Sequence, residues 1–174
     1  MLFFTIDVAN VQFSLTKEEE NTYKIKAYDK SFMDKEVKEC FSKAHKYVLD
    51  HHIPIDPIEL HKVYLAAVKA AKTSSTTFVT DRIHLSDINN VDICVQNDAG
   101  KYTLWLKSGF STSWDLLPVN EDPNDEAYIK AVNLFNEKLA QKLENELEKL
   151  KALEEKAIEL IKNITPITTL YKGN

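Results

Sequence analysis

The residues of this chain that could carry chemistry are few, and the tightest group is Asp81-Arg82-Ile83-His84. It places an acid, the only arginine of the chain and an imidazole next to one another. Because neighbouring side chains of a strand point to opposite faces, Arg82 and His84 should share one face and Asp81 should lie on the other. Such a pair could flank an anionic substrate or form the rim of a protein-binding surface. It could also be an ordinary solvated strand face.

The histidines do not form a metal-binding pattern. His51 and His52 lie at the predicted end of a helix, where the exposed carbonyls favour a positive charge. Glu59 and His61 fall on different sides of the next helix, and the chain has no HExxH sequence. We therefore expect no metal ion and no cofactor.

Other catalytic patterns are incomplete. A metal-dependent nuclease needs a second acid beside a lysine on the strand next to Asp92, and Trp105 stands in that place ahead of Lys107. The three glycines of the chain exclude the usual phosphate-binding loops, which need closely spaced glycines. An enzyme is therefore not favoured. A hydrolase or nucleotide-processing activity that uses Arg82 and His84 stays an alternative.

Aromatic side chains near one predicted strand are better candidates for binding. The alternation in residues 91–95 and 102–107 predicts a hairpin in which Trp105 faces away from the apolar side. If no helix covers that face, Trp105 and the loop residues Phe110 and Trp114 would form a protein-binding surface. If a helix covers it, Trp105 belongs to the core.

The elements that must position these residues predict an α+β fold. We expect an antiparallel sheet, built from an N-terminal meander and the central hairpin, with two packed helices and a long C-terminal helix. The strand pattern changes parity at Ala9-Asn10, which indicates either a bulge or a sharp turn. The central hairpin should turn at Asn97-Asp98-Ala99-Gly100, with Gly100 at positive φ.

Three places have residues that typically start helices. Asp56-Pro57-Ile58-Glu59 combines a capping aspartate, a proline at the first helical position and an early acid. Asp122-Pro123 repeats this pattern ahead of the long helix. Ser31 with Asp34 predicts a cap at the start of the first helix.

The last third of the chain predicts one long helix with a leucine stripe. From Asp122 to about Asn163 there is no glycine and no proline beyond Pro123 at the helix start, and Thr165-Pro166 should end the helix. We expect self-association as a coiled-coil dimer in which Asn136 helps to fix the register, although Glu146 interrupts the heptads. Packing against the chain's own sheet is the alternative. The leucines proposed for self-association are Leu139, Leu143, Leu150, Leu153 and Leu160.

Length and charge set the remaining expectations. The 174 residues fit an α+β domain over residues 1–120, with the long helix and a short tail over residues 121–174 as an extension of it. A net charge of −5 and a single arginine argue against nucleic-acid binding, which would have to use lysines of residues 24–46. Two cysteines without a disulfide framework and the lack of a long apolar run predict a cytoplasmic protein outside the membrane.

Together, these patterns predict a small intracellular protein that self-associates and docks onto another protein as an accessory or inhibitory factor. The lysine-rich, glycine-poor composition would suit a bacterial or phage genome. No motif in the chain points to a known family.

Overall fold

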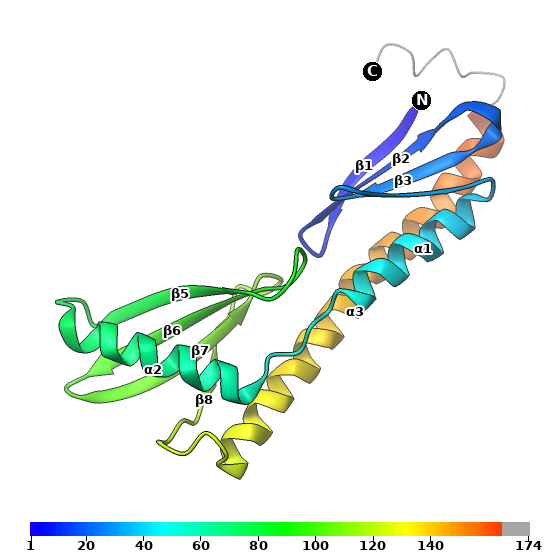
Figure 1. Cartoon of the computed structure of the whole chain (residues 1–174). Coiled ribbons are helices and arrows are strands. Elements are labelled where there is room, and N and C mark those ends of the chain that lie inside the picture. Colours follow the sequence, from blue (N-terminus) through cyan, green and yellow to red (C-terminus); the bar gives the residue numbers. More distant parts are fainter. Residues whose placement is uncertain (165–174) are drawn as a thin grey trace. The chain divides into compact units, whose positions relative to one another are not determined.

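The computed structural model describes residues 1–164 (Figure 1). The predicted α+β class with antiparallel pairing is confirmed, and the strands form two four-stranded sheets, one from β1 to β4 and one from β5 to β8. The predicted helix stop at Thr165-Pro166 and the tail after it lie outside the described residues. The elements are β1 Leu2–Val8, β2 Val11–Lys17, a short 3-10 helix Glu19–Asn21, β3 Tyr23–Ala27, β4 Lys30–Asp34, α1 Val37–Asp50, α2 Pro57–Thr73, β5 Phe78–His84, β6 Asn90–Asp98, β7 Lys101–Ser108, β8 Asp115–Leu117 and α3 Glu126–Ile164.

The chain divides into two compact units. Unit 1 comprises residues 1–50 together with the chain from residue 143 onward, and unit 2 comprises residues 51–142. Helix α3 therefore contributes residues 126–142 to unit 2 and its remainder to unit 1. The predicted domain division at residue 120 stays a prediction, because the units group residues by contact and not by independent folding.

Unit 1 is an antiparallel meander with α1 packed on β3 and β4. The parity change at Ala9 and Asn10 is a sharp turn, since both residues have positive φ (52° and 62°) and Val8 pairs with Val11. The sheet turns an apolar face inward, where α1 meets it. The buried core side chains of the meander and of α1 are Val8, Val11, Phe13, Leu15, Ile25, Ala27, Val37, Cys40, Phe41, Ala44 and Val48.

The predicted cap at Ser31 and Asp34 is wrong. Both residues belong to β4, which pairs with β3, and α1 begins only at Val37. Asp34 instead accepts a hydrogen bond from the Glu36 backbone N–H at 3.0 Å, in the turn between strand and helix. Pairing with a neighbouring strand therefore overrides a local capping pattern.

Unit 2 is built on the second sheet, with α2 and the first part of α3 packed on one of its faces. Helix α2 starts as predicted: the Asp56 carboxylate accepts from the Ile58 N–H at 2.8 Å, and Pro57 is the first helical residue. The predicted start of α3 at Asp122 is three residues early, because Asp125 accepts from the Tyr128 N–H at 3.0 Å. The buried core residues of the unit are Ile55, Leu60, Ala67, Val91, Ile93, Val95, Leu104, Leu106, Leu117, Tyr128, Val132, Phe135 and Leu139.

The central hairpin of unit 2 is formed by β6 and β7 in the predicted register, with Ile93 opposite Leu106 and Val95 opposite Leu104. Its turn residues Ala99 and Gly100 have φ values of 51° and 89°, so the expected positive φ at Gly100 is confirmed. The Gly100 N–H donates to the Asn97 side chain at 3.0 Å. Strand β8 pairs with β7 at the edge of the sheet.

Helix α3 buries a side with the period of a helix packed on a globular core, not that of a strict heptad. Leu147 is fully buried and Glu146 is only partly buried, although the heptad assignment places Glu146 in the stripe. Residues of the same chain cover this side of the helix. Its buried residues are Tyr128, Val132, Phe135 and Leu139 in unit 2, and Leu143, Leu147, Leu150 and Ala157 in unit 1.

Candidate functional site

Helices α2 and α3 pack on one face of the unit 2 sheet and form the core of that unit with it. The opposite face of the sheet is not part of this core. Side chains of one parity form the core with these helices, and those of the other parity project to the opposite side. We call this second side the open face. Its apolar members Phe78, Trp114 and Leu116 are 56%, 37% and 57% exposed. The open face consists of Phe78, Thr80, Arg82, His84, Asp92, Cys94, Gln96, Thr103, Trp105, Lys107 and Leu116 from the strands, with Trp114 from the loop ahead of β8.

The strand register aligns an apolar row across the open face. Cys94 lies opposite Thr80 on one side and Trp105 on the other, and Trp105 lies opposite Leu116. Directly opposite residues of antiparallel strands share a face and contact each other. The row forms the floor of a shallow, mostly apolar hollow of about 340 Å³, whose lining residues are Phe78, Thr80, Cys94, Gln96, Trp105 and Trp114. Trp105 therefore faces away from the core, as the alternation predicts.

The thiol of Cys94 is buried in the floor of this hollow. Burial raises its pKa, which keeps it in the thiol form near neutral pH. A thiol is a poor nucleophile compared with a thiolate, so Cys94 contributes packing at this place and not reactivity.

A charged row borders the hollow. Arg82 Nε donates to Asp92 Oδ1 at 3.0 Å, and Lys107 Nζ lies 3.8 Å from Asp92 Oδ2. Lys107 Nζ also lies 4.9 Å from the centre of the Trp114 ring, a cation–π contact that holds the loop against the sheet. The apolar hollow thus has a polar rim in which opposite charges are paired.

Arg82 and His84 share the open face and Asp81 lies on the other side, as expected. Each of the two side chains has its own hydrogen-bond partner. The guanidinium of Arg82 is bonded to Asp92, and His84 Nδ1 lies 2.8 Å from the amide oxygen of Asn90. The two side chains are therefore bonded to different partners and not to each other, and the Asn90 amide orients the His84 imidazole.

The other residues singled out from the sequence lie elsewhere. Phe110 packs against the core of unit 2 and does not join the open face. Of the leucines proposed for self-association, Leu139, Leu143 and Leu150 are at most 2% exposed, and Leu153 and Leu160 are partly buried. Association through them stays a prediction.

The lysines of residues 24–46 are partly engaged in ion pairs. Lys24 lies 3.0 Å from Glu18, and Lys43 lies 3.0 Å from Asp34. The hydrogen bond from Lys24 is the largest cause of the lowered pKa of Glu18. The carboxylate therefore stays charged beside the lysine.

Sequence reasoning missed two of the exposed apolar members of the open face, Phe78 and Leu116. Phe78 begins β5 with the same parity as Arg82, so the alternation could have placed it there. Leu116 lies on a three-residue edge strand that is too short to give a periodic signal.

Within residues 1–164, no group of three or more histidine, cysteine or acidic side chains is placed to hold a metal ion. No helix in this part of the chain is both long and apolar enough to cross a bilayer. The buried imidazole of His61 instead lies 3.0 Å from the Asn120 carbonyl, and His52 lies 3.0 Å from the Asn89 side chain.

Comparison with protein-family models, with curated proteins and with solved structures gives no match to this chain. Its class is therefore defined by its own fold and surface. It is an α+β protein with two antiparallel sheets, one of which carries an aromatic hollow with a charged rim.

Proposed function

We propose that this protein binds another protein through the open face and acts as an accessory or inhibitory factor. The observation that carries the proposal is the exposed apolar group Phe78, Trp114 and Leu116 around the partly buried Trp105. Contiguous apolar area on a protein surface is typical of an interaction site, and tryptophans are the side chains that most often anchor one.

The rim supports the same conclusion. Binding surfaces usually combine an apolar centre with polar residues that exclude water from it. Here Arg82, Asp92 and Lys107 form that border, and Asp92 offsets one of the two positive charges, so the border carries only one net positive charge. A partner is therefore expected to meet the hollow with apolar side chains, and not to be held by net charge.

The free, buried cysteines Cys40 and Cys94 support a reducing, cytoplasmic location, and the lysine-rich composition supports a bacterial or phage origin. We also propose that the protein self-associates. Association through the stripe of α3 would have to remove Leu139, Leu143 and Leu150 from the chain's own core, so we favour another surface for it.

The hydrolase and nucleic-acid alternatives stay predictions that no specific observation favours. Arg82 is engaged by Asp92, and Lys24 and Lys43 are engaged by nearby carboxylates.

Site-specific photo-crosslinking in the native host tests the proposed function. A photoreactive phenylalanine replaces Leu116 on the open face, and in a matched control it replaces Leu134, which is 49% exposed on α3. We expect a defined adduct with a different protein from position 116 and none from position 134. The adduct should weaken when Trp114→Ser is added. Equal adducts from both positions, or none from position 116, contradict the proposal.

A further inference from the structure

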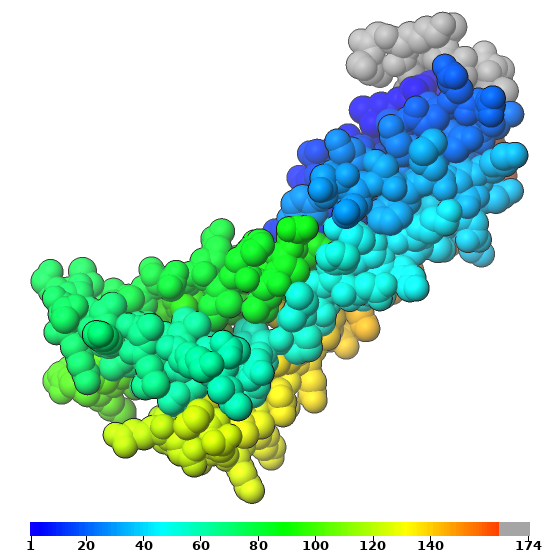
Figure 2. Space-filling view, in the orientation of Figure 1, coloured from blue at the N-terminus to red at the C-terminus, as the bar shows by residue number. Residues whose placement is uncertain are grey.

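Strand β5 is one of the two edges of the unit 2 sheet, whose order is β5-β6-β7-β8, and the other edge is the three-residue strand β8. The odd-numbered residues carry the backbone hydrogen bonds to β6. Just before β5 the Asn97 N–H donates to the Thr77 carbonyl at 2.7 Å, and just after β5 the Leu85 N–H donates to the Asn89 carbonyl at 3.1 Å. Antiparallel ladders alternate, so the backbone groups of Phe78, Thr80 and Arg82 point away from β6. All side chains of β5 except Val79 and Ile83 are exposed, and the green atoms of this part of the chain lie at the surface in Figure 2.

Two of these outward groups are occupied by neighbouring side chains. Asp81 Oδ1 accepts from the Arg82 N–H at 2.7 Å, and Thr76 Oγ1 donates to the Phe78 carbonyl at 3.1 Å. Such contacts blunt an edge, but a backbone partner of an added strand can replace them. Thr80 lies between the two occupied positions, at the centre of the edge.

We propose that a second copy of this chain adds to the sheet through β5, as an antiparallel pair with the two-fold axis at Thr80. In this arrangement Thr80 lies opposite the partner's Thr80, and Phe78 lies opposite the partner's Arg82. The outward backbone groups of Phe78, Thr80 and Arg82 then all gain backbone partners. An isologous dimer requires such a self-complementary stretch.

Charge selects this register among the neighbouring ones. An axis at Asp81 would put two carboxylates directly opposite each other, and an axis at Arg82 would do the same with two guanidinium groups. Like charges in opposed positions destabilise a strand pair. The axis at Thr80 places Arg82 opposite the partner's Phe78 and Asp81 opposite the partner's Val79, so no like charges are opposed. An axis at Val79 pairs fewer residues, because β5 begins at Phe78.

The pairing would extend the apolar row of the open face. Side chains at an antiparallel pair point to the same side, so the row from Thr80 through Cys94 and Trp105 continues into the same row of the second copy. The open face itself stays uncovered by β5 pairing. The inference rests on the proposed self-association and names its surface. It is independent of the proposed docking at the open face, so either of these two can fail without the other.

Sedimentation of the full chain at tens of micromolar tests the proposal with a substitution that acts on the outward edge alone. Thr80→Pro removes an N–H that β6 does not use, and proline is tolerated at such edge positions. We expect a dimer for the unchanged chain and for Thr80→Val, which keeps the N–H. Thr80→Pro should give a monomer with the same far-ultraviolet circular dichroism.

A second variant has an expected effect opposite to that of structural damage. Asp81→Ala frees the Arg82 N–H from its side-chain cap, and we expect it to tighten the dimer several-fold.

A third measurement tests the register in a Cys94→Ser background, which is needed because Cys94 lies opposite Thr80 in the same copy. Thr80→Cys should form a disulfide between two copies, since opposed residues of a strand pair lie within disulfide reach, whereas Arg82→Cys should not.

The proposal is overturned if the unchanged chain sediments as a monomer. This holds also if that monomer binds an extended segment of a different protein at β5. A dimer that persists in folded Thr80→Pro overturns it as well. A disulfide at position 82 without one at position 80 overturns the register.

Discussion

Asn136 and Ile55 exchange two hydrogen bonds: Asn136 Nδ2 donates to the Ile55 carbonyl, and Asn136 Oδ1 accepts from the Ile55 N–H, each at 2.9 Å. A side chain on α3 thereby supplies both bonds that a neighbouring strand would give. Ile55 is only 3% exposed and lies in the segment ahead of α2, where no helix or strand pairs its backbone. The residue that the heptad pattern assigned to a dimer register fixes this segment within its own chain.

Asn136→Ala should therefore lower the free energy of unfolding by about 1–3 kcal/mol, because it leaves a buried N–H and C=O without partners. Urea unfolding followed by circular dichroism measures the loss. Asn133→Ala on the exposed side of the same helix is the control, and it should be neutral or slightly stabilising. Equal effects of the two substitutions would show that the pair with Ile55 contributes nothing.

The burial of Leu147 distinguishes packing within the chain from packing between chains. Leu147→Ala should lower the free energy of unfolding by about 2–5 kcal/mol, the range for deleting a buried leucine side chain. The loss should not change with protein concentration, because the chain's own residues cover this leucine. Leu134→Ala, on the exposed side of the same helix, should change stability by less than about 0.5 kcal/mol. A loss that grows as the protein is diluted would instead indicate a coiled coil between chains.

The sequence predicts local features of this fold better than non-local ones. The start of α2 is correct because Asp56 and Pro57 act within one turn of their own positions. The hairpin turn at Gly100 is correct for the same reason. The pattern at Ser31 was misleading, since the pairing of β4 with β3 decides its structure. Capping rules consider only residues within a few positions along the chain, so they do not account for pairing with another strand.

The packing of α3 depends on partners that are distant in sequence. Spacings of three and four fit both a coiled-coil stripe and a helix on a globular core, and only the burial of Leu147 in place of Glu146 separates the two. The open face is an intermediate case. Alternation places Trp105 on the correct side, but whether a helix covers that side depends on where α2 packs.

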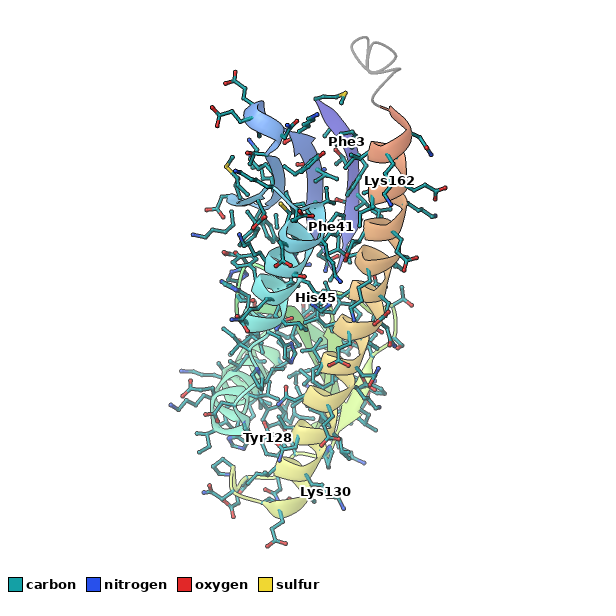
Figure 3. All side chains as sticks on the ribbon, turned by 90° about the vertical axis from the view of Figure 1, so that its right-hand side faces the viewer. Phe3, Phe41, His45, Tyr128, Lys130 and Lys162 are labelled. Atoms are coloured by element: carbon teal, nitrogen blue, oxygen red, sulfur yellow. The ribbon has the colours of Figure 1, made fainter. Side chains whose placement is uncertain are left out.

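The buried hydroxyl of Tyr128 in unit 2 should make the stability of the fold depend on pH in the alkaline range. Its hydroxyl donates to the Pro57 carbonyl at 3.1 Å, and its ring centre lies 5.8 Å from that of His61. Figure 3 places it near the beginning of α3. Burial first, and the charge of Asp56 second, raise the pKa of Tyr128 well above its usual range. The folded chain therefore keeps this phenol neutral at a pH where the unfolded chain ionises it.

The stability contributed by a raised pKa is present below the unfolded value and is lost as pH rises above it. Stability should thus fall above about pH 10, the usual tyrosine pKa. Tyr128→Phe should reduce this decline and cost about 1 kcal/mol at neutral pH through the lost hydrogen bond. Part of the decline should persist, because burial also raises the pKa of Tyr64. Urea titrations between pH 8 and 11 measure both effects, and an unchanged slope in Tyr128→Phe would refute the assignment.

Two histidines should make stability fall on mild acidification, one in each unit. Burial lowers the pKa of His52, although its hydrogen bond with Asn89 opposes the shift. Burial, followed by the charge of Lys151, lowers the pKa of His45, while Glu148 and Glu144 act in the opposite direction. His45 lies beside Phe41 on the part of α1 that faces α3 in Figure 3, and both residues line a small cavity with Leu150.

A lowered histidine pKa means that the unfolded chain binds the proton first as pH falls below about 6.5. The unfolded state then holds more protons than the folded state, so the free energy of unfolding rises with pH across this window. We expect a measurable decrease from pH 7.5 to pH 5.5, above the range in which most carboxylates titrate. His52→Gln and His45→Gln should each reduce the slope, and the double variant should nearly remove it. Glutamine at position 52 can still bond to Asn89, so a lower slope there reports the proton and not a lost contact. A double variant with the full slope would place the titrating groups elsewhere.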